Sequence, residues 1–154
     1  MNLAVIPARG GSKRIPKKNI KDFLGKPIIS YSIEAAIDCG LFDRIMGSTD
    51  GNDIAKVALK YGAEVPFIRP NELSDDYSGI HEVIRHSINW FESRGDTVDY
   101  GCCIYATAPL INVNDIIEGF KLIQTGNWDS VIAATDYPYP IFRSFEKLSS
   151  GGLR

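Results

Sequence analysis

The sequence has no long hydrophobic run: none approaches the roughly 18 consecutive apolar residues that a membrane-spanning helix needs. Its N-terminus likewise lacks the apolar stretch and cleavage site typical of a signal peptide. With 44% hydrophobic and 23% charged residues among 154, the composition is that of a globular protein rather than a disordered one. We therefore expect a single cytoplasmic domain over residues 1–154, with no membrane partner.

Cysteine and histidine patterns that bind metals are missing as well. The cysteines form neither a Cys-x-x-Cys pair nor a zinc-type spacing, and we expect Cys39, Cys102 and Cys103 to be reduced, buried thiols. His81 and His86 are five positions apart on a predicted helix, so they point about 140° apart around its axis and cannot share one ligand. The sequence therefore predicts no metal site made of protein ligands.

Positive charge is scarce outside one short stretch. The net charge is −2, yet residues 9–26 contain seven lysines and arginines against Asp22 alone, while ten basic residues face eighteen acidic ones elsewhere. This asymmetry attracts a small anion to one place, and the acidic remainder repels a polyanion. The basic stretch contains one aromatic residue, Phe23, and so lacks the stacking side chains typical of nucleic-acid binding. We expect no nucleic-acid partner.

What the sequence does contain is an alternation of strand and helix patterns. Short apolar segments predict strands at residues 2–6, 44–48, 64–68, 100–105 and 130–135. Helical periodicity predicts four helices: from Pro27 to Gly40, from a cap at Asp50 or Asn52 to Gly62, from a cap at Ser78 through Phe91, and from a cap at Asn112 or Asn114 to Gly126. Such alternation predicts an α/β fold with a mostly parallel sheet covered on both faces.

The basic stretch lies where a ligand is expected in such a fold. Parallel sheets bind ligands outside the carboxyl ends of their strands. Residues 9–19, 48–50 and 105–111 all follow predicted strands, and the polar loop 69–78 leads out of another. The sequence therefore predicts that these four segments border one binding site.

The start of the basic stretch suits a polyphosphate. Gly10, Gly11 and Ser12 let backbone N–H groups turn inward, and cationic side chains follow them. The motif is neither a Walker A loop nor a GxGxxG fingerprint. The alternative interpretation is a solvated basic loop without a binding role.

Five segments carry a resemblance to a known family: "IPARGGSKRIPKKNI", "FLGKPII", "STD", "YGAEVPFIRP" and "YATAP". In this order and spacing, from Leu3 to about Phe145, they resemble the acylneuraminate cytidylyltransferases, which make CMP-activated nonulosonic acids. The tyrosine of "IYATAP" is similar to the pseudaminic acid branch of that family. The resemblance implies a three-layer α/β/α, Rossmann-like nucleotide-diphospho-sugar transferase fold that lacks its C-terminal part.

The resemblance also implies a reaction and the residues that serve it. The anomeric hydroxyl of a nonulosonic acid, with pseudaminic acid favoured, attacks the α-phosphate of CTP, and pyrophosphate leaves with the assistance of magnesium. Matching positions imply that Arg9 and Lys18 hold the triphosphate and act in catalysis, and that Ser12 and Lys13 shape the turn. They imply that Asn19 contacts the nucleoside and that Arg69 and the backbone at Ser78 read cytosine. Tyr105 and Thr107 are implied to line the sugar side. A homodimer is implied in the same way.

The chain also departs from the family pattern. Gly47 stands where a β-branched strand residue is usual, and Gly79 and Ile80 follow Ser78 where small hydroxyl residues are usual. The family's metal-binding carboxylates lie in a C-terminal segment, and no matching acidic motif is present before Arg154. The sequence therefore predicts either a fragment or a shortened relative with impaired catalysis.

Some roles stay open on sequence grounds. Thr49 and Asp50 suit helix capping as well as ligand binding. We expect Asp75 and Asp76 to be solvated loop charges. Two other functions are kept as alternatives: a sugar nucleotidyltransferase acting on a shorter keto-acid sugar, and a nucleotide-binding module without catalysis.

Overall fold

The computed structural model describes residues 1–75, 77–136 and 149, so Asp76 and most of the tail lie outside the described residues. The chain forms two compact units, residues 1–118 and residues 119–154. The first unit contains the sheet and three of the four long helices, and the fourth helix, α4 (Val113–Gln124), begins in it. All residues of the predicted site lie in the first unit.

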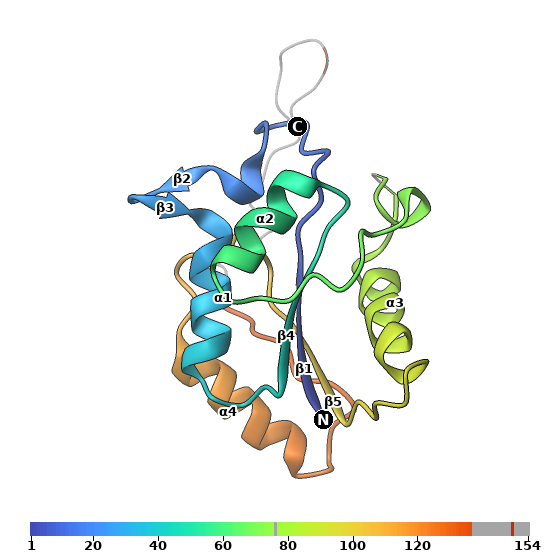
Figure 1. The fold of residues 1–154 in the computed structure, drawn as a ribbon. Helices are drawn as coiled ribbons and strands as arrows, with labels where there is room; N and C mark the ends of the chain where they lie inside the picture. Colours follow the sequence, from blue (N-terminus) through green and yellow to red (C-terminus); the bar gives the residue numbers. More distant parts are fainter. Residues whose placement is uncertain (76, 137–148, 150–154) are drawn as a thin grey trace. The chain divides into compact units, whose positions relative to one another are not determined.

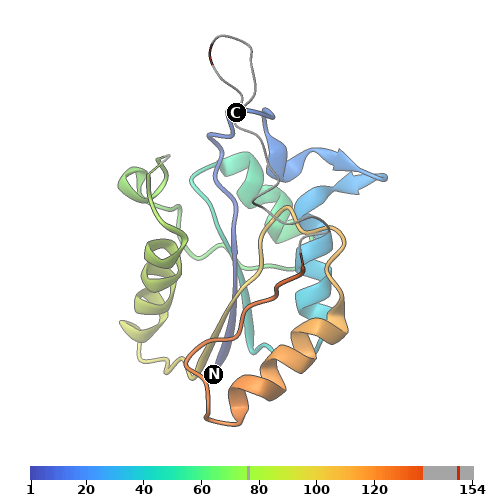
Figure 2. The same ribbon diagram turned by 180° about the vertical axis from the view of Figure 1, so that it is seen from behind.

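The main sheet has three parallel strands (Figures 1 and 2). β1 (Asn2–Pro7) lies between β4 (Arg44–Ser48) and β5 (Tyr100–Cys103). Pro7 is paired with Ser48, so β1 and β4 end side by side. The basic stretch after β1 and the Ser-Thr-Asp motif after β4 therefore start from the same edge, as the sequence predicts.

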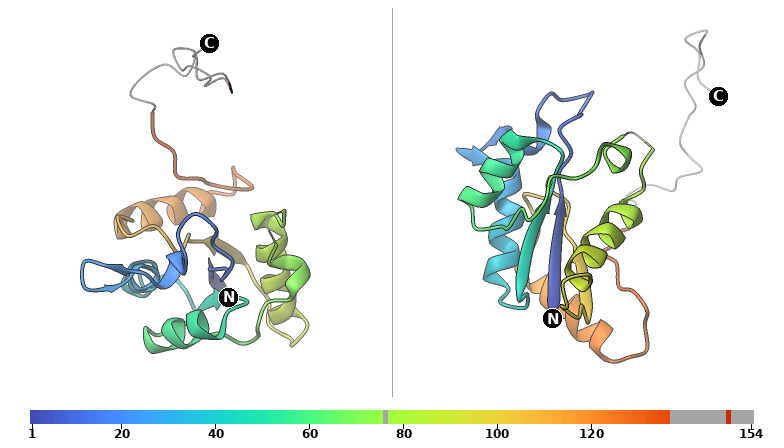
Figure 3. Two further views of the ribbon diagram at one scale, coloured as in Figure 1. Left: turned by 90° about the horizontal axis from the view of Figure 1, so that it is seen from above. Right: turned by 45° about the vertical axis from the view of Figure 1, so that its right-hand side comes forward.

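Helices cover both faces of this sheet (Figure 3). α1 (Ile28–Asp38) and α2 (Asn52–Lys60) lie on one face, and α3 (Ile80–Glu92) lies on the other. Successive side chains of β1 point to opposite faces, so Ala4 and Ile6 pack toward α1 and α2, whereas Leu3 and Val5 pack with Phe91 of α3. All four of these β1 residues are fully buried. The predicted α/β architecture with a covered parallel sheet is confirmed.

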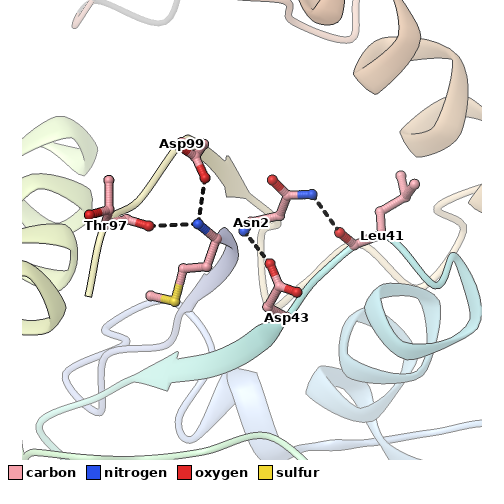
Figure 4. A network of polar contacts seen from close by, with 6 residues as sticks. Asn2, Leu41, Asp43, Thr97 and Asp99 are labelled. Atoms are coloured by element: carbon pink, nitrogen blue, oxygen red, sulfur yellow. Dashed lines mark hydrogen bonds and ion pairs between the residues drawn. The ribbon is translucent and has the colours of Figure 1, made fainter. Parts of the chain in front are cut away.

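The amino end of β1 is held in place by polar contacts (Figure 4). The ammonium group of Met1 donates to Thr97 O at 2.6 Å and contacts Asp99 Oδ2 at 2.5 Å. The amide N–H of Asn2 donates to Asp43 Oδ2 at 2.6 Å. These contacts join β1 to the segments that lead into β4 and β5, at the opposite end of the strand from the basic stretch.

Three short elements form the second half of the basic stretch, before α1. The 3₁₀ turn η1 (Lys18–Ile20) is followed by β2 (Asp22–Phe23) and β3 (Lys26–Pro27), which pair antiparallel. Pro27, predicted as the first helical residue, belongs to β3 and has an extended ψ of 135°, so α1 starts one residue later. This prediction was wrong because the short hairpin holds Pro27 opposite Asp22.

The third and fifth predicted strands are not formed. Residues 64–68 approach β4 through a single bridge, Met46 to Glu64, because Pro66 has no N–H with which to continue the ladder. Residues 130–135 are exposed and pair with no described residue. The strand predicted at 100–105 is shorter than expected and ends at Cys103.

The helix caps also differ from the predictions. α2 begins after Gly51 and α3 after Gly79, rather than after the predicted side-chain caps. For α4, Asn112 Oδ1 accepts the N–H of Asn114 at 2.9 Å, so Asn112 is the capping residue. Another 3₁₀ turn, η2 (Asn71–Leu73), interrupts the polar loop before α3. No helix of the described part of the chain has the length and apolar character needed to cross a membrane.

The three cysteines are free thiols in different environments. Cys39 is buried, Cys102 is half-buried and Cys103 is exposed. Burial raises the pKa of the Cys102 thiol to about 11, so this group stays protonated at neutral pH. The expectation that all three are buried was wrong for Cys103, the last residue of β5, which is exposed.

Gly47 allows close packing between β4 and α2. A Cβ atom at this position would lie 3.2 Å from Ala58 Cβ and 3.6 Å from Val65 Cγ2. The N–H of Gly47 donates to Glu64 O at 2.8 Å, so the strand is well formed in spite of the glycine. The missing side chain is thus matched by the small residue on the facing helix.

We expect Gly47→Val to lower the free energy of unfolding by about 1–3 kcal/mol, because the added methyl groups overpack this contact. Urea unfolding of the variant measures the change. Ala58→Gly in the same chain should restore part of the loss, although Ala58→Gly alone costs about 1 kcal/mol in a helix. Equal midpoints for Gly47→Val and the wild type would contradict this account of the packing.

Candidate functional site

The structure brings all nine predicted site residues to one cleft. The cleft has a volume of about 770 Å³ and lies at the carboxyl edge of the sheet. The predicted residues that line it are Arg9, Ser12, Lys13, Lys18, Asn19, Arg69, Ser78, Tyr105 and Thr107. They come from the segments after β1 and β5 and from the loop before α3. Residues 48–50, predicted to border the same site, do not line the cleft and contact the basic loop instead, through Ser48 and Asp50.

Contacts at both ends fix the basic stretch above the sheet edge. Ala8 N–H donates to Ser48 O at 2.9 Å, and Gly10 N–H donates to Asp50 Oδ1 at 2.7 Å. At the other end, the buried side chain of Asn19 donates to Arg9 O at 2.8 Å. The stretch is therefore a defined loop, although most of its side chains are exposed.

The middle of the loop is attached to α2 by an ion pair. Lys17 Nζ lies 2.9 Å from Asp53 Oδ2, and Lys17 has a left-handed backbone with φ of 51°. The Lys17 ammonium group lowers the pKa of Asp53 below its usual value. A lowered carboxyl pKa means that the contact is complete at neutral pH and is lost as the pH falls through that value.

The loop presents cationic side chains to the cleft. Lys13, Arg14 and Lys18 line it and are exposed. Lys18 makes no side-chain hydrogen bond or ion pair with any residue that the structure describes. An exposed ammonium group at this position suits a diffusible anion, because no residue in the described part of the chain pairs with it.

Arg69 is a buried cation in the loop before α3 and lines the same cleft. Its residue is only 4% exposed, and its Nε donates to Ser74 Oγ at 3.1 Å. Its backbone N–H donates to Thr49 O at 2.7 Å, which ties it to the end of β4. Burial lowers the pKa of Arg69, Asp50 raises it, and the positive charge of Arg9 lowers it further. The cleft therefore holds two arginines that repel each other.

The loop before α3 is folded around Asp75. Asp75 Oδ1 accepts the N–H groups of Tyr77 at 3.0 Å and Ser78 at 2.7 Å. Arg9 Nη1 donates to Asp75 O at 2.7 Å, which joins this loop to the basic one. Asp75 was expected to be a solvated charge; it is exposed, but it also organises the turn that places Ser78 at the cleft.

The segment after β5 forms another wall of the cleft. Tyr105 is 60% exposed, so its ring is available to a ligand. Its carbonyl accepts from the buried hydroxyl of Ser32 on α1 at 2.7 Å, which fixes the backbone beneath the ring. Thr107 lies further along the same wall and is half-buried. An exposed ring on a backbone held in this way suits contact with a ligand.

The Ser-Thr-Asp motif does not cap α2 through Asp50. Thr49 is buried, and its Oγ1 accepts the N–H of Gly51 at 3.1 Å. The Asp50 carboxylate accepts instead from Gly10 in the basic loop. The capping interpretation of Asp50 is therefore wrong, because the carboxylate is turned toward β1 rather than toward the helix.

Sequence reasoning missed part of the cleft lining. Arg14 belongs to the same basic run and could have been included on charge alone. Apolar residues complete the cleft, and their role depends on tertiary placement that no local pattern shows; together these further lining residues are Pro7, Arg14, Ile15, Leu73, Ile80, Val83 and Ala106. The cleft thus combines a cationic side with an apolar floor.

The residues present do not form a magnesium site. Among the described residues, no group of three or more His, Cys, Asp or Glu side chains could hold a metal ion. Magnesium binds through several oxygen ligands in near-octahedral geometry, and the Asp50 carboxylate near the cleft is already bonded to Gly10. We assign no protein ligand to magnesium and derive no step through it.

A parallel sheet with a glycine-containing basic loop and a polar cleft at its carboxyl edge defines an α/β protein of the doubly wound class. A solved structure of CMP:2-keto-3-deoxy-manno-octonic acid synthetase complexed with CTP matches it with a TM-score of 0.69. The match covers 80% of this chain and 47% of that one, at 21% sequence identity. The Rossmann-like α/β fold is thereby confirmed.

The family model for cytidylyltransferases matches residues 3–138, and the chain belongs to this family. Pseudaminic acid cytidylyltransferase of Campylobacter jejuni is 49% identical over 144 residues, which cover 94% of this chain and 62% of that protein. CMP-N,N'-diacetyllegionaminic acid synthase of Legionella pneumophila is 51% identical over 83 residues, which cover 53% of this chain and 36% of that protein. The chain thus spans less than two thirds of the length of these relatives.

Proposed function

We propose that this chain binds CTP and transfers CMP to a nonulosonic acid, with pseudaminic acid favoured, and that it releases pyrophosphate. The observation that carries the proposal is the meeting of all nine predicted site residues in one cleft. The 49% identity to a pseudaminic acid cytidylyltransferase supports the choice of sugar. In the proposed reaction the sugar hydroxyl oxygen forms a bond to the α-phosphorus and loses its proton. The bond between that phosphorus and the oxygen that bridges it to the β-phosphate breaks, and pyrophosphate leaves with this oxygen.

The charges of the cleft suit the departure of pyrophosphate. Negative charge accumulates on the leaving group, and fixed cations stabilise it most where the charge develops. We assign Arg9 and Lys18 to the triphosphate, with Ser12 and Lys13 on the turn that shapes its site. Asn19, whose amide nitrogen already donates to Arg9 O, would contact the nucleoside through its oxygen.

Base and sugar are assigned to the other walls. The buried guanidinium of Arg69 and the backbone of Ser78 would read cytosine, because cytosine offers an amine where uracil offers a carbonyl and one hydrogen bond distinguishes them. Tyr105 and Thr107 would contact the nonulosonic acid. Residues 1–154 acting as one nucleotide-binding domain, a homodimer, a magnesium requirement and a cytoplasmic location go with this proposal.

Two measurements on the purified chain test the function. Calorimetry should detect CTP binding and much weaker binding of UTP. Release of pyrophosphate should require CTP, magnesium and the sugar, and should be faster with pseudaminic acid than with N-acetylneuraminic acid. CTP binding without any pyrophosphate release would favour a nucleotide-binding module instead. Absence of CTP binding would contradict the assignment of the cleft.

A further inference from the structure

We propose that Asp50 is a positioning residue, which rests on the proposed function: its carboxylate holds the basic loop at Gly10 in the geometry that receives the triphosphate. Nothing in the family resemblance distinguished this role from helix capping. The proposal makes the turn after β4 part of the nucleotide site, although Asp50 itself is expected to make no contact with CTP.

Asp50 is well placed to act as a rigid anchor. It follows Ser48 and Thr49, which are fully buried at the end of the central β1–β4 pair. Its Oδ1 accepts the N–H of Gly10 at 2.7 Å. A Cβ atom on Gly10 would lie 3.7 Å and 3.8 Å from the two carboxylate oxygens, so the carboxylate lies alongside the loop backbone. The first turn of the loop is thereby held in a fixed position relative to the sheet.

The charge of Asp50 points to the same role. A carboxylate beside a polyphosphate site opposes anion binding by like-charge repulsion. Its presence is therefore unfavourable for affinity unless it orders the groups that bind the anion. Asp50 also stabilises the charged form of Arg69, which burial and Arg9 both disfavour. One side chain thus connects the loop that meets the phosphates with the buried arginine on the other side.

Two variants separate the hydrogen bond of Asp50 from its negative charge. Asp50→Asn keeps an oxygen that can accept from Gly10 and removes the negative charge. Asp50→Ala removes both. If positioning by the hydrogen bond is the function, asparagine should retain CTP affinity within about threefold of the wild type. Alanine should weaken CTP binding about tenfold and lower kcat as well, since a displacement on the order of 1 Å in a binding group costs up to about 100-fold.

A matched control is available in the same region. Asp22 Oδ1 accepts the N–H of Gly25 at 3.3 Å, the same kind of contact. Gly10 directly follows Arg9, which lines the cleft, whereas neither Asp22 nor Gly25 is next to a lining residue. Asp22→Ala should leave CTP affinity and kcat near the wild-type values. Thermal unfolding of each variant identifies any general loss of structure.

The outcomes decide between distinct explanations. If wild-type chain binds no CTP, the proposed function fails before Asp50 is tested. If wild-type chain binds CTP and folded Asp50→Ala binds it equally well, positioning by Asp50 is overturned. If Asp50→Ala does not fold, Asp50→Asn still tests the anchor: a loss of CTP affinity beyond threefold in a folded variant overturns positioning by the hydrogen bond in favour of a charge-dependent role, and affinity within threefold excludes that charge-dependent role.

Discussion

Lys18→Ala is expected to lower kcat for pyrophosphate release by about 10²- to 10³-fold, the loss typical when one donor to a developing anion is removed. Lys18 lines the cleft and has no ion-pair partner among the described residues, so its removal leaves no buried charge behind. Calorimetry measures the change in CTP affinity, and a pyrophosphate assay at saturating substrate measures the change in kcat.

Lys21→Ala provides the control for Lys18. Lys21 is exposed, belongs to the same basic stretch and does not line the cleft. It should change CTP binding only slightly, and mainly at low ionic strength, because distant surface charges are screened by salt. Equal losses in both variants would show that the stretch attracts CTP by its total charge, and the assignment of Lys18 to the triphosphate would be abandoned.

Arg69→Met is expected to weaken CTP binding by about 10- to 150-fold, which corresponds to one charge-assisted hydrogen bond of about 1.5–3 kcal/mol. Stability should stay within about 1 kcal/mol of the wild type. Methionine fills similar space without a charge, and burial already disfavours the charged guanidinium. The variant thus separates binding from folding, as measured by calorimetry and urea unfolding.

Arg85→Met is the matched control for Arg69. Arg85 is an exposed residue of α3 and does not line the cleft, so the same substitution there should leave CTP affinity unchanged. A large loss of stability in Arg69→Met, with normal CTP affinity in the folded fraction, would identify Arg69 as a structural residue of the loop.

Strands could be predicted where the local hydrophobic pattern is enough to indicate them. The apolar run of β1 and the segment of β4 appear at the expected positions, because a strand covered on both faces needs a continuous hydrophobic sequence. Residues 64–68 have the composition of a strand but contain Pro66. The hydrophobic pattern does not show that this proline interrupts the hydrogen-bond ladder. Strand pairing depends on partners, and residues 130–135 have none among the described residues.

The members of the cleft could be predicted better than the contacts that hold them. Family motifs and strand ends together identified nine of the sixteen residues that line it. The contacts from Asp50 to Gly10 and from Asp53 to Lys17 join residues about 40 positions apart. No periodicity or spacing in one sequence reveals such pairs, because they depend on how β1 and β4 align.

The path of residues 64–69 beside β4 has a consequence for how this site can change. The segment is attached at Glu64, whose N–H donates to Ile45 O at 2.8 Å, and again at Arg69, whose N–H donates to Thr49 O at 2.7 Å. Five steps along this segment match four along β4, so the segment is one residue longer than the strand it follows. Loss of one residue would shorten the path between these two attachments, and the backbone contacts of Glu64 and Arg69 could not both be kept. The place of the guanidinium in the cleft therefore depends on the number of residues in this segment.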